Sequence, residues 1–248
     1  TNRGVGSMYA DKLKGKTAPS FFGYSGPRGG CMKPKFWLER WQENQIGFHQ
    51  VGHNPMLVEF WPQLGLASGA RVFVPLCGKS LDMRWLEAAG HSVTGVELAQ
   101  IAVENYFDQE TSEQHIVDRF VCHRGEATDI YQGDFFDLTS PLLENIAGVF
   151  DRSALVALPK DMRFRYVDHM LRVIPDGCRM LLVTLEYDQS LVSGPPHSVE
   201  QEEVESLYGH RCEIEQLDSF VTSTLPPYFA NRGVREAVES VYRIAKRD

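Results

Sequence analysis

The chain has 248 residues, of which 43% are hydrophobic and 23% are charged, and its formal net charge is −8. This composition is typical of a globular protein and excludes collagen-like, coiled-coil and fully disordered chains. No apolar run reaches the roughly 18–20 residues that a membrane-spanning helix needs. Residues 1–31 hold five Lys/Arg and one Asp, so the rest of the chain is strongly acidic. Such a body is a poor binder of nucleic acid phosphates or anionic membranes.

Residues 1–31 differ from the rest of the chain. They contain seven glycines and no hydrophobic periodicity, and they match neither a secretory signal nor a transit peptide. Met32 is followed by a dense aromatic segment that includes Trp37 and Trp41. We therefore expect residues 1–31 to be a flexible extension outside the native fold, and residues 32–248 to form a single domain.

The cysteine pattern indicates reduced thiols. The chain has five cysteines at wide spacings, without a CxxC or a Cys/His pair at zinc spacing, which predicts a cytoplasmic protein without disulfides. His49 and His53 belong to no HExxH motif and have no carboxylate partner in sequence. We therefore expect no metal site.

Strands and helices alternate from about residue 70 onward. The expected helices, after an aromatic N-terminal helix that Gly47 ends, are 81–89, 98–107, 161–174 and 199–208. Leu81, Trp85, Leu86 and Ala89 are expected on or near one inner face of the first of these four. The expected strands are 71–76, 92–97, 120–122, 130–131, one that begins at 148–151, 179–186, 212–219 and 235–245. The alternation predicts an α/β doubly wound sheet, mostly parallel and covered on both faces. The last two strands lack a helix between them and predict an antiparallel edge.

The turn after the first strand is the expected nucleotide site. It lacks GxGxxG, and Phe73 occupies the position of the first glycine of a P-loop, which argues against an ATPase. Gly78 would allow close backbone approach to a ligand, and Glu97 ends the second strand nineteen residues later. An acid at that place accepts hydrogen bonds from ribose hydroxyls. Glu97 could equally cap the next helix or face solvent.

A second acidic segment follows a later strand. Asp134 and Phe135 come directly after Gly133. In this place Asp134 could receive the amino group of an adenine, and Phe135 could pack on the base. The alternative is an ordinary acidic turn.

Several segments together resemble the bacterial members of the thiopurine S-methyltransferase family. They occur in order and cover nearly all of residues 36–247, and PLCGKS and DRxALVA are specific in combination. The segments are Phe36–Trp41, Gly47–Gln50, Val74–Ser80, Gly90–Val93, Gly95–Glu97, Phe136–Leu138, Asp151–Arg152, Ala154–Ala157 and Gly194–Pro196.

The resemblance implies a class I methyltransferase (Rossmann-like) fold that uses S-adenosylmethionine. It implies methyl transfer to the sulfur of aromatic and heterocyclic thiols, thiopurines among them, and bacterial members also handle selenium and tellurium compounds. A small-molecule thiol is thus the expected partner, with no nucleic acid and no membrane. We expect a monomer, because no apolar patch demands a partner.

The resemblance also implies roles for single residues. The expected cofactor-binding residues are Trp41, Leu76, Gly78, Glu97, Asp134, Phe135 and Arg152. Phe48 and Trp37 are expected on the substrate side, and the aromatic helix is expected to act as a lid. Animal members have glycine where Ser153 stands, and they carry a further arginine on a late loop, for which Arg232 is the nearest candidate.

The expected chemistry is an in-line displacement that needs alignment rather than a strong base. Arg152 stays protonated, so it would stabilise the thiolate or anchor the acceptor. Asp151 would orient Arg152 or the acceptor, or it would be a strand-end acid held by backbone N–H groups. Cys77 is expected to be a small buried residue. The alternatives are a methyltransferase with oxygen, carboxylate or metalloid acceptors, a non-catalytic S-adenosylmethionine-binding protein, and, least supported, an NAD-dependent oxidoreductase.

Overall fold

A computed structural model describes residues 34–108, 112–223, 225 and 227–247, so the expectation for residues 1–31 lies outside this part. The described strands join in one sheet, in the order β3-β4-β5-β2-β1-β6-β7-β9-β8. Their bounds are β1 (Arg71–Val74), β2 (Ser92–Glu97), β3 (Glu113–Val117), β4 (Phe120–Arg124), β5 (Thr128–Gln132), β6 (Ile146–Arg152), β7 (Arg179–Glu186), β8 (Cys212–Thr222) and β9 (Ala237–Lys246).

The centre of the sheet is parallel. β1 pairs in parallel with both β2 and β6, while β5 and β7 extend the sheet on either side. β2 and β5 lie on one side of β1, and β6 and β7 lie on the other. The gap between β1 and β6 is therefore the topological switch point. Val72, Phe73 and Val74 are all buried, because a central parallel strand is covered on both faces and reads as an apolar run. The expected doubly wound sheet is confirmed.

Antiparallel strands occur at both edges. β9 lies between β7 and β8 and is antiparallel to each of them, as the missing helix predicted. The β3–β4 hairpin at the other edge was not expected. Residues 120–122 belong to its antiparallel strand β4, and the third parallel strand is β5. β3 escaped prediction because it is largely exposed and lacks an apolar face.

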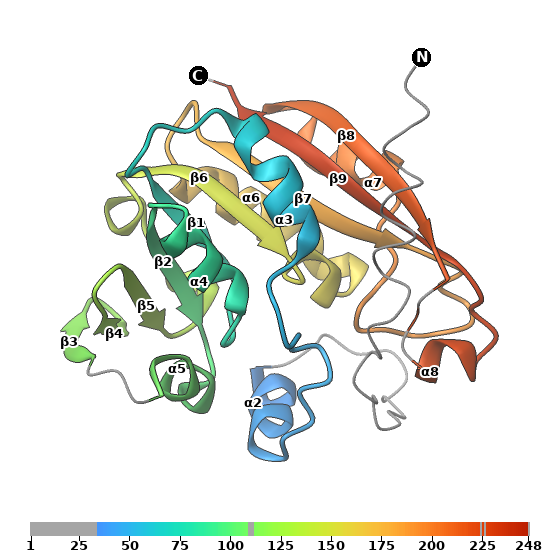
Figure 1. Cartoon of the computed structure of the whole chain (residues 1–248), viewed down its shortest axis with the longest axis horizontal. Coiled ribbons are helices and arrows are strands. Elements are labelled where there is room, and N and C mark those ends of the chain that lie inside the picture. Colours follow the sequence, from blue (N-terminus) through green and yellow to red (C-terminus); the bar gives the residue numbers. More distant parts are fainter. Residues whose placement is uncertain (1–33, 109–111, 224, 226, 248) are drawn as a thin grey trace.

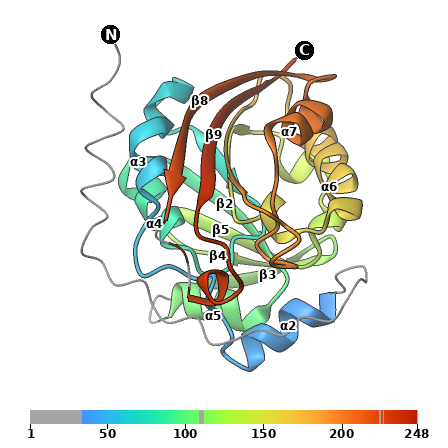
Figure 2. The same cartoon turned by 90° about the vertical axis from the view of Figure 1, so that its right-hand side faces the viewer.

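The helices cover both faces of the sheet, with α6 and α7 on one side and α3 and α4 on the other (Figure 2). Their bounds, together with the short 3₁₀ turns, are α2 (Pro34–Gln42), α3 (Pro55–Phe60), η1 (Trp61–Leu64), α4 (Leu81–Ala88), α5 (Gln100–Phe107), η2 (Phe135–Asp137), η3 (Ser140–Leu142), η4 (Leu155–Ala157), α6 (Lys160–Val173), α7 (Gln201–Tyr208) and α8 (Pro227–Ala230). Within these described elements, none has the length and apolar character that crossing a bilayer requires.

Two helix predictions were wrong in detail. The aromatic helix α2 ends at Gln42 and not at Gly47, because Asn44 adopts a left-handed conformation with φ 52°. Asparagine tolerates this conformation and ends helices in the same way as glycine. In α4 the buried residues are Asp82, Met83 and Leu86, whereas Leu81 is 38% exposed. The expected inner face of α4 was therefore rotated from the true one.

Two apolar cores hold the layers together. Tyr166 and Met170 of α6 are fully buried against one face of the sheet. Leu57, Phe60 and Trp61 of α3 and η1 fill the other face. The segment before β1 thus forms a covering helix that the sequence pattern did not predict. The four described cysteines are free thiols, as expected, and all four are buried: Cys77, Cys122, Cys178 and Cys212.

Candidate functional site

The carboxyl ends of the parallel strands meet at one edge of the sheet. The turn after β1, Glu97 at the end of β2 and Arg152 at the end of β6 all lie there. Figure 1 shows α2 and α8 beside this edge. Ligands of doubly wound sheets bind outside the carboxyl ends of the strands at the switch point, so this edge is the candidate site.

The turn after β1 is closely covered by α2. Leu76 and Gly78 both have positive φ, of 45° and 53°. A Cβ added at Gly78 would lie 3.1 Å from Cζ2 of Trp41, and Trp41 packs against Ala99 and Ala102 at the start of α5. Glycine fits this position best, since both the backbone conformation and the Trp41 ring oppose a side chain. The turn thus offers a narrow stretch of exposed backbone at Leu76 and Gly78, beneath the Trp41 ring. We call this turn the cradle.

Glu97 binds the backbone of this turn through its carboxylate. Its Oε2 accepts a hydrogen bond of 2.9 Å from the Gly78 N–H, and its Oε1 accepts one of 2.7 Å from the Ala99 N–H. Burial raises the pKa of Glu97, and the backbone N–H groups around it oppose that rise. Each carboxylate oxygen keeps a second lone pair that could accept from a hydroxyl. The helix-capping interpretation and the ribose interpretation are therefore compatible.

Cys77 follows β1 but offers no nucleophile. Its side chain is 5% exposed, and burial, with the Glu97 charge adding to it, raises the pKa of the Cys77 thiol well above its usual range. A buried thiol that stays protonated is a poor nucleophile. The expectation of a small buried residue is confirmed.

Asp134 and Phe135 form an acidic turn, and the adenine role expected of them stays a prediction. Asp134 accepts a 2.9 Å hydrogen bond from the Phe136 N–H and begins η2. The Phe135 ring is 3% exposed, with its centroid 4.8 Å from that of Tyr166 and 5.2 Å from that of His169. The structure therefore places this ring in the core between the sheet and α6.

Arg152 belongs to a charged cluster next to the cradle. Its Nη1 lies 3.8 Å from Oδ2 of Asp82. Asp82 is almost fully buried and accepts hydrogen bonds from the Asn54 N–H at 2.6 Å and the Ser80 hydroxyl at 3.0 Å. Asp82 was not predicted as a site residue. The Ser80-x-Asp82 spacing at the start of a helix is a capping signal that could have drawn attention to it.

Three aromatic rings, followed in sequence by His49, form a wall of the candidate site. The ring centroid of Phe48 lies 5.6 Å from those of both Trp37 and Trp41, so the three expected aromatic residues form one wall. His49 follows, and burial, with Lys79 and Arg152 adding to it, lowers the pKa of His49. The charges of Lys79 and Arg152 thus both disfavour the protonated form of His49.

Asp151 and Arg152 are not brought together. Side chains of successive strand residues point to opposite faces of a sheet. Asp151 is fully buried on the α6 side, where it accepts hydrogen bonds from the Leu155 N–H at 3.1 Å and the Tyr166 hydroxyl at 2.7 Å. Burial raises the pKa of Asp151 to about 6. This matches the alternative of a strand-end acid held by backbone N–H groups, and it places Asp151 away from the reacting groups.

Arg232 lies beyond α8 and is exposed. Its backbone N–H donates to the Phe229 carbonyl at 3.0 Å, and its charge acts on Tyr228, as does that of Arg40 from α2. The structure thus places Arg232 beside Tyr228 and gives it no described contact with Arg152.

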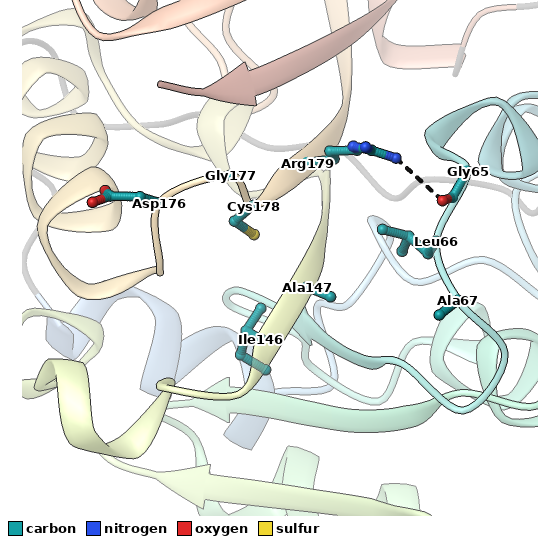
Figure 3. A pocket seen from close by; sticks show the side chains of 9 residues that line it. All are labelled: Gly65, Leu66, Ala67, Ile146, Ala147, Asp176, Gly177, Cys178 and Arg179. Carbon is teal, nitrogen blue, oxygen red and sulfur yellow. Dashed lines mark hydrogen bonds between the residues drawn. The ribbon is translucent and has the colours of Figure 1, made fainter. Parts of the chain in front are cut away.

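A surface hollow of about 380 Å³ lies at the amino ends of β6 and β7. Figure 3 shows Arg179 at its rim, where the guanidinium donates to the carbonyls of Leu64 at 2.6 Å and Gly65 at 3.1 Å. Because this guanidinium is already satisfied and the hollow lies at the end of the strands away from Arg152, we assign it no chemistry. The described residues contain no group of three or more His, Cys, Asp or Glu that could hold a metal ion.

Solved structures share this architecture. An S-adenosylmethionine-dependent methyltransferase from Anabaena variabilis matches with a TM-score of 0.60 at 13% identity, over 91% of this chain and 100% of its own. The 1,6-didemethyltoxoflavin-N1-methyltransferase of Burkholderia thailandensis, solved with bound S-adenosylhomocysteine, matches with a TM-score of 0.58 at 14% identity, over 91% and 94%. The strand order and the site at the switch point define the class I methyltransferase fold.

The family follows from sequence similarity. The profile described as Thiopurine S-methyltransferase (TPMT) matches residues 32–247, and the chain belongs to this family. The thiopurine S-methyltransferase of Nitrosospira multiformis is 45% identical over 87% of this chain and 99% of its own length. That of Pseudomonas putida is 44% identical over 87% and 100%. A probable thiopurine S-methyltransferase of Yarrowia lipolytica is 43% identical over 86% and 100%.

Proposed function

We propose that this chain transfers the methyl group of S-adenosylmethionine to the sulfur of aromatic and heterocyclic thiols such as thiopurines. The observation that carries the proposal is the position of Arg152. A largely buried guanidinium stands at the end of β6, directly across the switch point from the glycine cradle. It is the kind of group that stabilises a thiolate, and the relatives' names point to the same substrates.

The residues around the cradle suit the proposed cofactor. When bound, S-adenosylmethionine supplies an electrophilic methyl group on a sulfonium centre. Trp41, Leu76 and Gly78 would enclose the adenosyl portion, because a Cβ at Gly78 would fill the space beneath Trp41. Glu97 would accept from the ribose hydroxyls, and Asp134 would lie on the adenine side.

Arg152 would lower the pKa of the acceptor thiol by holding a positive charge next to the sulfur. The rings of Trp37 and Phe48 would shield this region from water, which strengthens that interaction. The lowered pKa of His49 disfavours a competing positive charge on it. Asp151 would act only indirectly, since its hydrogen bond from the Leu155 N–H holds the loop that follows Arg152.

The proposed reaction is tested by methyl transfer from labelled S-adenosylmethionine to 6-mercaptopurine, with a control that lacks the acceptor. We expect thiol-dependent transfer by the wild-type chain and a kcat/KM lower by ~10–10³-fold for Arg152→Ala, the range of one lost charged contact. Transfer to oxygen or metalloid acceptors but not to thiols would overturn the proposed substrate class. Unchanged kinetics in a folded Arg152→Ala variant would remove Arg152 from the mechanism.

We also propose that the protein acts as a monomer in the cytoplasm and binds neither nucleic acid nor membrane. Free cysteines in the described part of the chain suit a reducing compartment. The acidic body repels nucleic acid phosphates and anionic lipids.

A further inference from the structure

Glu239 in β9 faces the same side of the sheet as Arg152. Arg152 is directly opposite Val183 of β7, and Val183 is opposite Val241 of β9. Residues paired across neighbouring strands point to the same face, and so do residues two positions apart. Glu239, paired with Leu185, therefore projects to the face that carries the Arg152 side chain. Because β9 runs antiparallel to β7, this part of β9 lies at the carboxyl ends of β6 and β7.

The surroundings of Glu239 are apolar. Its neighbours across the two adjacent strands are Leu185 and Phe220, and the side chain is only partly exposed. Desolvation raises the pKa of Glu239, and the charge of Arg152 opposes this rise. Within the described ranges this carboxylate makes no hydrogen bond and no ion pair. A carboxylate in such a place is costly unless a donor reaches it.

Arg152 thus has two acids near it, but only one has free acceptor capacity. Asp82 already accepts hydrogen bonds from Asn54 and Ser80 in addition to the Arg152 ion pair. The charges of Lys79, Arg152 and Asp82 all act on His49. A molecule bound against Arg152 on the β9 side would meet the unsatisfied Glu239 carboxylate.

We propose that Glu239 takes the proton that a neutral heterocyclic acceptor must lose when its sulfur is methylated. The inference rests on the proposed function and assigns this site a preference for acceptors with a ring N–H next to the C=S carbon. The carboxylate accepts a hydrogen bond from that N–H, while Arg152 faces the sulfur.

The electron count of this step balances. The acceptor sulfur forms a bond to the methyl carbon, and the methyl–sulfonium bond breaks with its electron pair remaining on the departing thioether sulfur. The C=S bond of the acceptor becomes C–S, and the adjacent ring C–N bond becomes C=N. The N–H proton moves to a carboxylate oxygen of Glu239 and from there to solvent.

The test compares two acceptors with Glu239→Gln. 6-Mercaptopurine carries the proton that must leave, whereas 4-nitrothiophenol is ionised at neutral pH and has no ring N–H. We expect kcat/KM for 6-mercaptopurine to fall by about 10–100-fold, near the low end of general-base effects, and kcat/KM for 4-nitrothiophenol to fall by far less. Glu239→Asp should restore part of the loss, because it keeps a carboxylate.

Matched controls make the result decisive. Glu236→Gln makes the same charge change at an exposed position three residues earlier, and it should alter neither acceptor. Equal losses with both acceptors would assign Glu239 only a role in holding Arg152 and would overturn the proposal, as would no loss with either. A wild-type chain that binds S-adenosylhomocysteine but methylates neither thiol would instead refute the proposed function.

Discussion

Asp151 and Arg152 are consecutive residues of β6, yet they occupy different environments. The Asp151 carboxyl is buried on one face of the sheet, where it accepts a hydrogen bond from Tyr166. The Arg152 guanidinium forms an ion pair with Asp82 on the opposite face. The pleat of the strand separates them. One residue therefore supports the loop after β6, and the other faces the space where an acceptor would bind.

The buried Asp151 should make stability depend on pH. Its folded-state pKa of about 6 lies above the ordinary value of 3.8, so folding favours the protonated form. The resulting stability is fully present below the ordinary pKa and is lost as pH rises through about 6. Relative to Asp151→Asn, which stays neutral, the wild-type free energy of unfolding should fall by about 2–3 kcal/mol between pH 4 and 7.

Urea unfolding of both proteins across this pH range measures the effect. A difference between wild type and Asp151→Asn that does not vary with pH would show that the carboxyl keeps its ordinary pKa. The Asp151→Asn variant also changes a fully buried group that is bonded to Tyr166, so it can be less stable than the wild type by a constant amount at every pH. Only the part of the difference that varies with pH tests the prediction.

At the scale of elements, the turn after β1 and helix α2 depend on each other. Gly78 and Gly69 both have positive φ, but a Cβ at Gly69 would meet no atom within 4 Å, whereas one at Gly78 would press on Trp41. Gly69→Ala should therefore cost only the backbone strain, about 1 kcal/mol. Gly78→Ala should cost more and should weaken S-adenosylhomocysteine binding by about tenfold or more, since the Trp41 wall must move.

Calorimetric titration with S-adenosylhomocysteine, together with urea unfolding, separates these effects. Gly69→Ala is the matched control, because it introduces the same side chain at a similar φ far from the cradle. Equal losses of stability and unchanged affinity in both variants would show that the Trp41 contact is unimportant.

Helix α2 has the features of a lid. Trp41, Ala99 and Ala102 form a small apolar cluster of their own, separate from the two main cores. We therefore expect that α2 detaches without unfolding of the sheet. Trypsin cleavage after Lys35 or Arg40 should slow when S-adenosylhomocysteine is added. Cleavage after Arg119 in the β3–β4 turn should not change, and equal protection at all three sites, or at none, would contradict a lid.

At the scale of the whole molecule, the sheet formed by the described residues has β3 and β8 as its edge strands. Open edges invite pairing between copies unless charged side chains oppose it. β8 carries Glu213, Glu215 and Asp218, and β3 begins at the exposed Glu113. These acids repel the same edge of a second copy, which favours the proposed monomer.

Light scattering coupled to size exclusion tests this expectation. The measured mass should equal the 28.1 kDa of one chain and should not rise with protein concentration. A stable mass of twice that value would contradict the monomer and would show that the edge charges do not prevent self-association.

The expected bounds of β2 and β7 agree with the structure residue for residue. Both strands are buried in the sheet, and the sequence of such a strand is an apolar run between turns. The glycine turn and Glu97 could likewise be found by spacing, since both belong to one strand–turn–helix–strand unit. By contrast, β3 has no apolar face and α3 is only six residues long, so neither leaves a periodic signal.

The sequence alone thus determined the fold class, the family resemblance and the cradle, all of which rest on local patterns. Only the tertiary structure separated Asp151 from Arg152, sank Phe135 into the core and brought Asp82 and Glu239 toward the same guanidinium. These outcomes depend on strand register and on the face to which each side chain points. A shift of one residue in register would reverse that face, and no local pattern specifies which strands become neighbours.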